Sequence, residues 1–272
     1  MQKTKLALSM ISAAALLSLA ACGGGGGDSA PTTQQPATPT PPAPTITVNG
    51  SATTVSADPL AFVFVPVDAT SNGLAARAGA TANAPATLQA TTAEGAYKTI
   101  AGNAASVISL TSGTIADVGG NGQFSIGRWT NGATNVGSIN ANQGAHYVVG
   151  KPLALVSVPG PTAKLTCTAQ FATAPTAVSG NFAAGKLNSA TAVINLNGPS
   201  IESLALDLSI ASDRVTKTFA NAGVVGVNLS STGTLLAETM GSDQAKPYLS
   251  VGYTVASQSS GDVSGAIVFA CQ

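Results

Sequence analysis

The segment IESLALDLSIA, at residues 201–211, alternates apolar and polar side chains along most of its length. From Leu204 to Ile210 the even-numbered residues are leucine or isoleucine, and the odd-numbered ones are alanine, aspartate or serine. Successive side chains of a β-strand point to opposite faces, so this pattern predicts a strand with one buried face and one wet face. Such half-buried strands are typical of antiparallel sheets.

Similar segments recur along the chain, separated by Gly, Asn, Pro and Ser. Strands are predicted at 60–67, 124–130, 146–150, 164–171, 190–196, 223–229, 249–255 and 263–271. The alanine-rich stretch 74–94 has few apolar anchors and is predicted as a loop or a weak helix. Many short strands indicate an all-β fold, either a sandwich or an antiparallel up-and-down barrel of about eight strands. The barrel is favoured because it leaves no exposed sheet edges.

Residues 1–21 have the features of a secretory signal: two lysines at the start, an apolar run at 6–19, and small residues before Cys22. The run is too short for a transmembrane helix, which needs ~20 residues. The segment 19–22, Leu-Ala-Ala-Cys, resembles the bacterial lipobox, in which the cysteine is lipidated and the chain is cut before it. Gly23 follows where an Asp would suggest retention at the inner membrane, so the resemblance implies a lipid anchor in the outer membrane.

Residues 22–45 combine Cys22 with a Gly/Pro-rich tether. Glycine runs are flexible and proline-rich tracts are extended, so this segment is predicted to hold a domain away from the membrane rather than to fold. At ~3.1 Å per residue it reaches on the order of 70 Å. Residues 46–123 are then predicted as a β-rich, handle-like N-terminal region, and residues 124–272 as the barrel domain.

The composition argues against a nucleic-acid partner. Charged residues make up 8% of the chain, with eleven basic and eleven acidic side chains. Removal of Lys3 and Lys5 with the signal leaves nine basic residues and a formal charge near −2. No cluster of Lys or Arg forms a basic surface. Hydroxyl and amide side chains dominate instead, which suits β-sheet.

Two cysteines remain if Cys22 carries lipid, and both lie on apolar strand faces. Cys167 shares a face with Leu165, Ala169 and Phe171, and Cys271 shares one with Val263, Ile267 and Phe269. An even number of cysteines in an oxidising compartment favours a Cys167–Cys271 disulfide. The alternative is a pair of separate buried thiols.

Several segments in order resemble a known family. GRWTNG at 127–132 and HYVVGKP at 146–152 resemble the start of a barrel domain similar to that of transferrin-binding protein B. The order continues with ATAPT at 172–176, GNF at 180–182, GKL at 185–187, the strand at 201–210, and hairpin segments at 248–255 and 265–270. The resemblance implies an eight-stranded antiparallel barrel behind an N-terminal handle, on a lipid anchor. Members of this family bind host proteins, haem-related partners or unknown ligands. The resemblance therefore does not identify a ligand for this chain. Cys167 and Cys271 depart from the pattern, which has an aromatic and a basic residue there.

No catalytic, metal or cofactor site is predicted, so the chain is expected not to be an enzyme. His146 is the only histidine, and a strand-end residue bonded to its neighbours is favoured over a metal ligand. The chain has no Gly-x-Ser-x-Gly motif and no evident pair of carboxylates. Arg128 and Trp129 are candidates for a binding spot through cation–π stacking, but a structural pair at a strand start is favoured.

Three functions fit these features. The leading one is an outer-membrane lipoprotein that binds a protein or glycan partner through surface loops, because loops vary without disturbing a core. The predicted loops are 131–145, 212–222 and 231–246, the last with Glu238, Asp243 and Lys246 as candidate binding residues. The alternatives are a lipocalin-like carrier of a small apolar ligand and a structural envelope lipoprotein.

The anchor is tested by the substitution Cys22→Ser. Cells fed a palmitate analogue are expected to label the wild-type chain, which then partitions into detergent, because the thioether forms on this cysteine. The Cys22→Ser chain is expected to lose both properties. Label retained on the variant would contradict the assignment.

Overall fold

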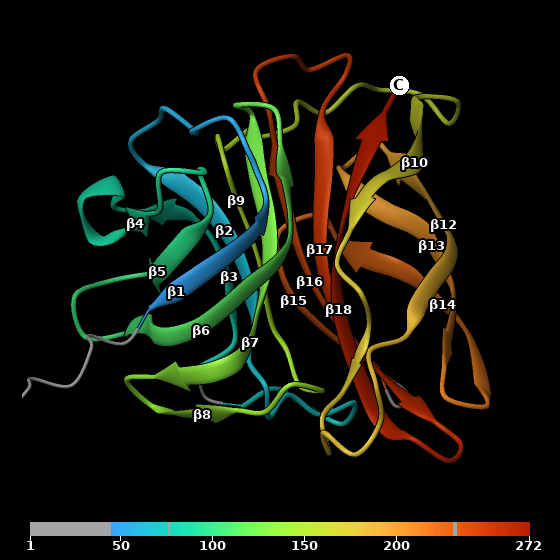
Figure 1. Ribbon diagram of the computed structural model, residues 1–272. Coiled ribbons are helices and arrows are strands. Elements are labelled where there is room, and N and C mark those ends of the chain that lie inside the picture. Colours follow the sequence, from blue (N-terminus) through green and yellow to red (C-terminus); the bar gives the residue numbers. More distant parts are fainter. Residues whose placement is uncertain (1–44, 76, 231–232) are drawn as a thin grey trace, which may run out of the picture. The chain divides into compact units, whose positions relative to one another are not determined.

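Strands form nearly all the regular structure in residues 45–75, 77–230 and 233–272, the part of the chain that the computed structural model describes (Figure 1). The predicted signal, Cys22 and nearly all of the tether lie outside these residues. The described part holds no α-helix, and its one helical turn is the 3-10 element η1, Ala86–Leu88. None of its helices could therefore span a membrane. The all-β prediction is confirmed.

The second half of the chain forms a nearly closed barrel of eight antiparallel strands, drawn from yellow to red in Figure 1. Its strands are β10 (Lys164–Ala172), β12 (Lys186–Asn195), β13 (Ser200–Ile210), β14 (Asp213–Gly223), β15 (Gly226–Ser230), β16 (Gly233–Met240), β17 (Tyr248–Ser257) and β18 (Gly261–Cys271). Short β11 (Thr176–Ala177) pairs with β18. The hydrogen-bonded order is β14-β13-β12-β10-β18-β17-β16-β15, so β10 and β18 close the meander while β14 and β15 leave a seam.

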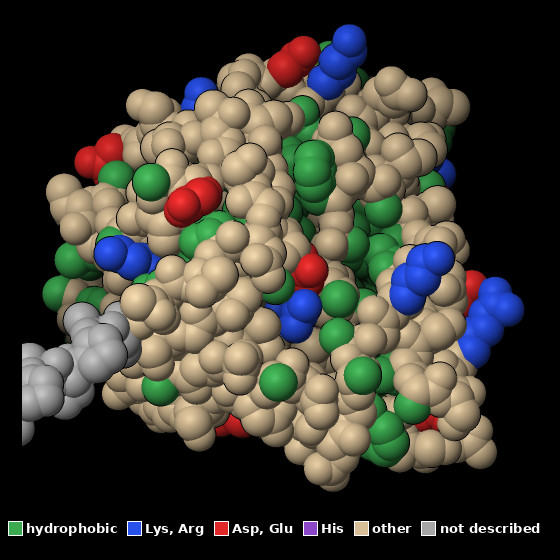
Figure 2. Space-filling model, in the orientation of Figure 1, with side chains coloured by type: hydrophobic (Ala, Val, Ile, Leu, Met, Phe, Trp, Pro, Cys, Tyr) green, Lys and Arg blue, Asp and Glu red, His purple; other side chains and the backbone are tan. Residues whose placement is uncertain are grey.

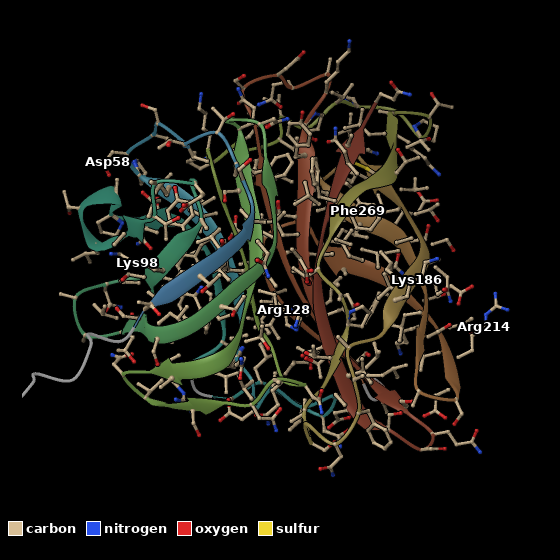
Figure 3. All side chains as sticks on the ribbon, viewed as in Figure 1. Asp58, Lys98, Arg128, Lys186, Arg214 and Phe269 are labelled. Atoms are coloured by element: carbon tan, nitrogen blue, oxygen red, sulfur yellow. A yellow bond between two sulfur atoms is a disulfide. The ribbon has the colours of Figure 1, made fainter. Side chains whose placement is uncertain are left out.

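The barrel interior is filled by the side chains that the alternation predicted. Leu204, Leu206, Leu208 and Ile210 are all buried, and Asp207 on the opposite face is not. Facing strands add further buried side chains, including Phe269, which Figure 3 shows between the strands of the barrel. Burial of a Leu or Ile side chain contributes about 1.5–3 kcal/mol, so this apolar layer is a main source of stability.

The first half of the chain forms a second sheet, an open half-barrel drawn from blue to green in Figure 1. Its strands are β1 (Ile46–Gly50), β2 (Leu60–Val65), β3 (Gly79–Ala84), β4 (Ala90–Thr91), β5 (Tyr97–Ala101), β6 (Val107–Gly120), β7 (Phe124–Thr134), β8 (Gly137–Ile139) and β9 (Ala145–Gly150). The main path is β3-β2-β9-β7-β6-β5-β4, and only β1 pairs in parallel, with β6. Trp129 and Tyr147 lie in its core, fully buried.

The two sheets share an apolar layer within the compact unit Ala43–Gln272. Phe124 of β7 contacts Phe171 and Tyr248 of the barrel, with ring centroids 5.5 and 4.9 Å away. Gly252 of β17 allows a close approach, because a Cβ there would lie 2.4 Å from a methyl group of Val65. A larger residue at position 252 would push the sheets apart.

Two predicted boundaries need correction. The barrel was expected to start at residue 124, but β7, β8 and β9 belong to the first sheet, and the barrel starts with β10. The reason is that β7 pairs with β6 and β9 and has no partner in the barrel. The stretch 74–94, expected as a loop or weak helix, contains η1 and the strands β3 and β4. Its small residues fit beside Phe62, whose ring lies 3.7 Å from a Cβ placed on Gly79.

The Cys167–Cys271 disulfide is confirmed. The two residues are register partners on β10 and β18, with Cα atoms 4.0 Å apart. The next pair along, Thr166 and Gln272, exchanges both backbone hydrogen bonds. The cysteines therefore occupy a non-hydrogen-bonded pair, where opposed side chains lie closest. The bridge covalently joins the first and last strands of the barrel.

Replacing both cysteines, Cys167→Ala with Cys271→Ala, is expected to lower the free energy of unfolding by ~2–4 kcal/mol. The bond closes a loop of 104 residues and so restricts the unfolded chain. Urea unfolding of the oxidised domain measures the loss. Addition of reductant should lower the free energy of unfolding of the wild type to that of the variant. A loss below ~0.5 kcal/mol would show that strand pairing alone closes the barrel.

Candidate binding surfaces

The predicted pair Arg128 and Trp129 does not form a surface binding spot. The two residues are neighbours on β7, so their side chains point to opposite faces. Trp129 is fully buried in the first sheet, where its indole Nε1 donates to the carbonyl of Tyr97 at 2.8 Å. Arg128 is 7% exposed and lies where the two sheets meet (Figure 3). Both residues therefore have structural positions, as favoured, but they lie in the middle of β7 and not at a strand start.

Arg128 belongs to a polar junction between the sheets. Its Nε donates to Oδ2 of Asp117 at 2.7 Å, and the same carboxylate oxygen accepts from the backbone N–H of Ala174 in the barrel, at 2.9 Å. Asp117 sits at a bulge of β6, with a φ of 57°. One carboxylate thus joins β7 to the segment that follows β10. The sequence carries no signal for Asp117, because the bulge depends on the pairing of β6 with β7.

His146 completes this junction and is fully buried at the start of β9. Its Nδ1 lies 2.8 Å from the hydroxyl of Thr173, and its Nε2 lies 3.0 Å from that of Thr176. Burial and the nearby Arg128 hold the pKa of His146 well below its usual range, so the ring is neutral. The prediction of a strand-end histidine bonded to its neighbours is confirmed. Among the described residues no cluster of His, Cys, Asp or Glu could hold a metal ion.

Glu238, Asp243 and Lys246 do not form a common loop site. Glu238 lies in β16 and is fully buried, whereas Asp243 and Lys246 are exposed in the connection to β17. All three predicted loops contain strands: β14 covers nearly all of 212–222, and β16 covers half of 231–246. The third, 131–145, contains the end of β7 and β8. These segments were predicted as loops because polar residues on their strands resemble the composition of a loop.

The carboxyl group of Glu238 has no hydrogen-bond partner on either oxygen. It shares a face of β16 with Leu236 and Met240, which belong to the apolar layer between the sheets. Burial raises the pKa of Glu238 to about 8, so this acid is mostly neutral at pH 7. A neutral carboxyl group costs much less in an apolar layer than a charged one.

A polar cleft of about 600 Å³ opens in the barrel wall between β10 and β12. The β10–β12 ladder ends at Thr168 and Thr191, after which each strand pairs only with its other neighbour. A hydrogen bond of 2.7 Å from the N–H of Gly185 to the carbonyl of Pro175 joins the two sides again. In the shared orientation of Figures 2 and 3, the surface is hollowed between Arg128 and Lys186. Its lining mixes small apolar residues with hydroxyl and amide side chains, the latter from Thr168, Gln170, Thr173, Asn188 and Ser189.

An apolar strip lies at the seam of the barrel. Val225, Val227 and Leu229 are 53%, 51% and 67% exposed, and we refer to them as the β15 strip. Val227 and Leu229 occupy alternate positions of β15 and so share one face, and Val225 lies in the bend just before the strand. A hollow of about 320 Å³ lies between the facing parts of β14 and β15. The sequence predicted this strand but gave no sign that its edge lacks a partner.

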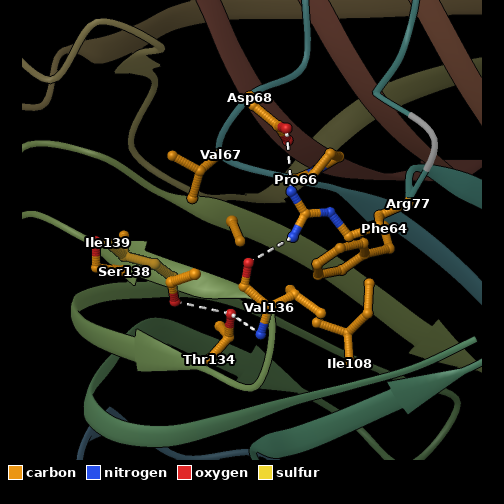
Figure 4. A pocket seen from close by; sticks show the side chains of 12 residues that line it. Phe64, Pro66, Val67, Asp68, Arg77, Ile108, Thr134, Val136, Ser138 and Ile139 are labelled. Carbon is orange, nitrogen blue, oxygen red and sulfur yellow. Dashed lines mark hydrogen bonds and ion pairs between the residues drawn. The ribbon is translucent and has the colours of Figure 1, made fainter.

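An apolar groove lies on the open side of the first sheet. It consists of adjoining hollows of about 420 and 130 Å³, and both are lined by Phe64, Arg77, Ile108 and Val136. Figure 4 shows the smaller hollow, with the guanidinium group of Arg77 between Asp68 and the Val136 carbonyl. Nothing in the sequence pattern singled out Arg77, because these residues come from four separate segments. We refer to this site as the Arg77 groove.

Comparison with known proteins gives no relative: no family model, no curated protein and no solved structure matches the chain.

Glu238→Gln is expected to flatten the pH dependence of stability. The unfolded carboxyl ionises near pH 4.5 and the folded one near pH 8, so stability falls as pH rises through this window and levels off above it. The total loss is at most ~5 kcal/mol. The uncharged variant should therefore exceed the wild type in stability at pH 9.

Urea unfolding of both proteins from pH 5 to 9 measures this effect. The difference between them isolates Glu238, because His146 titrates in both. Asp243→Asn is the matched control, since this carboxyl group is exposed and the change should leave the curve unaltered. Parallel curves for wild type and Glu238→Gln would contradict the assignment.

Proposed function

We propose that this chain is a lipid-anchored outer-membrane protein that captures a protein partner by adding one of its strands to the open seam of the barrel. The single observation that carries the proposal is the β15 strip. Contiguous exposed apolar side chains mark interaction sites, and an exposed apolar edge strand is a template for pairing with another chain. Binding, rather than catalysis, is the activity that this surface supports.

The edge of β15 has no strand partner, and across the seam the side chain of Asn228 exchanges two hydrogen bonds with the main chain of Gly223 at the end of β14. β15 pairs only with β16, and β14 pairs only with β13. Natural edge strands are commonly protected by charged residues or proline. The segment 218–237, which contains β15, holds no charged residue and no proline. An incoming extended segment would gain main-chain hydrogen bonds from the edge and specificity from alternate side chains.

The strip also continues an apolar surface that already exists. Val227 is the register partner of Leu236, which lies in the layer between the two sheets. β3, the terminal strand of the first sheet, contacts β15. A partner strand on β15 would therefore extend the intersheet layer outward, and the two sheets would not have to separate. The proposed binding surface is therefore the edge of a strand, β15, and not the surface loops that the sequence analysis favoured.

The envelope location rests on the N-terminal sequence. The signal-like residues 1–21, the lipobox-like segment before Cys22 and the Gly/Pro-rich tether support an anchored, displayed domain. The eight-stranded meander behind an N-terminal sheet is compatible with the proposed resemblance to transferrin-binding protein B-like barrels. Resemblance of this kind names no partner.

The substitution Val227→Lys tests the proposal, because lysine protects edges and Val227 is exposed enough to accept it without loss of the fold. Residues 23–272, which contain the whole compact unit, are immobilised and exposed to envelope extract and host serum. A partner recovered by the wild type should bind Val227→Lys about tenfold more weakly or worse. Val158→Lys is the matched control, at an exposed valine outside the seam.

Equal affinity of Val227→Lys and wild type would contradict strand addition at β15. If Gln170→Leu abolished recovery instead, the polar cleft would be the binding site. That cleft offers hydroxyl and amide groups suited to a glycan. Circular dichroism of each variant checks that the fold is retained.

A further inference from the structure

The Arg77 groove exists because the first sheet does not close. Its path ends at β3 on one side and at β4 on the other, and β2, β3, β5 and β6 contribute to the groove walls. The combined volume of the two hollows falls within the usual range of small-molecule sites, about 300–1,000 Å³. The groove shares none of its lining residues with the seam or the polar cleft.

The groove combines apolar walls with one polar group that can orient a ligand. Phe62, Phe64, Ile100, Ile108 and Val136 supply most of the apolar lining. Val136 is 44% exposed, so part of this apolar surface is open to solvent. Small-molecule sites are typically apolar with a few placed polar groups.

Arg77 lines both hollows and does not use all of its hydrogen-bond donors. Its Nη2 donates to Asp68 at 3.1 Å and its Nη1 donates to the carbonyl of Val136 at 3.2 Å. A guanidinium group has five N–H donors, so three remain for other acceptors. Arg77 and Asp68 are the only charged residues in the described lining, and they neutralise each other.

We propose that the Arg77 groove binds one neutral amphipathic molecule, with an acyl or similar apolar body against Phe62, Phe64 and Ile108 and an uncharged acceptor oxygen at Arg77. The charge balance selects the head group. A ligand carboxylate would place a second negative charge beside Asp68, whereas an ester or hydroxyl oxygen accepts from the guanidinium without that repulsion.

The chain contains its own reporter for binding. Trp129 is the only tryptophan, and its ring centroid lies 5.5 Å from that of Phe64, which lines both hollows. A ligand against Phe64 should alter the emission of Trp129. Calorimetry provides an independent measure of affinity and stoichiometry.

The experiment compares monodecanoylglycerol with decanoate, which share a ten-carbon acyl chain and differ in head-group charge. Residues 23–272 are titrated at pH 7.5 with each probe below its micelle concentration. Saturable one-to-one binding of the glyceride is expected, with decanoate at least about tenfold weaker. Equal or tighter binding of decanoate, or no saturable binding of the glyceride, would overturn the proposal.

Variants locate the site. Val136→Glu places a charge in the groove and should weaken glyceride binding at least about tenfold, whereas Val156→Glu, at an exposed valine elsewhere, should leave it unchanged. Arg77→Gln should weaken it about fivefold through lost hydrogen bonds. Glyceride affinity unaffected by Val136→Glu would overturn the proposal. Val227→Lys should bind the glyceride normally, which separates this site from the proposed seam.

Discussion

Pairing between β10 and β18 is the contact on which the barrel depends. The remaining ladders between neighbouring barrel strands join segments that lie close in sequence, and a short connection can form each of them. The β10–β18 ladder instead joins Cys167 to Cys271 across 104 residues. Closing so long a loop costs conformational entropy before any contact stabilises it. The apolar interior and the disulfide offset this cost together, since neither forms fully without the ladder.

The layer between the two sheets has a different chemistry from the barrel interior. Aromatic and aliphatic contacts around Phe124 supply its cohesion. Polar groups then fix how the sheets meet: Asp117 accepts from both Arg128 and the backbone N–H of Ala174, and His146 bonds two threonine hydroxyls. Because hydrogen bonds are directional, this junction specifies one arrangement more narrowly than apolar packing alone. Glu238 lies in the same layer, and neither of its carboxyl oxygens has a hydrogen-bond partner.

Alternation of side chains predicted the barrel strands whose two faces differ most, such as β13 and β18. It also placed Cys167 and Cys271 on facing sides. The pattern failed for β14, whose wet face and free edge give it the composition of a loop, and for β16, whose Glu238 resembles a surface residue. Alternation also could not predict which sheet a strand joins, because β7 has the same pattern of side chains whichever strand it pairs with. The Arg77 groove depends on residues from distant segments, which no local pattern brings together.

The position of the disulfide has a consequence for biosynthesis. If the chain is exported as proposed, Cys167 leaves the translocation machinery about a hundred residues before Cys271, and its thiol has no disulfide partner until Cys271 follows. The chain has only one other cysteine, Cys22. A lipid thioether on Cys22 would remove that competing thiol. Lipidation would then act as a safeguard of correct oxidation as well as an anchor.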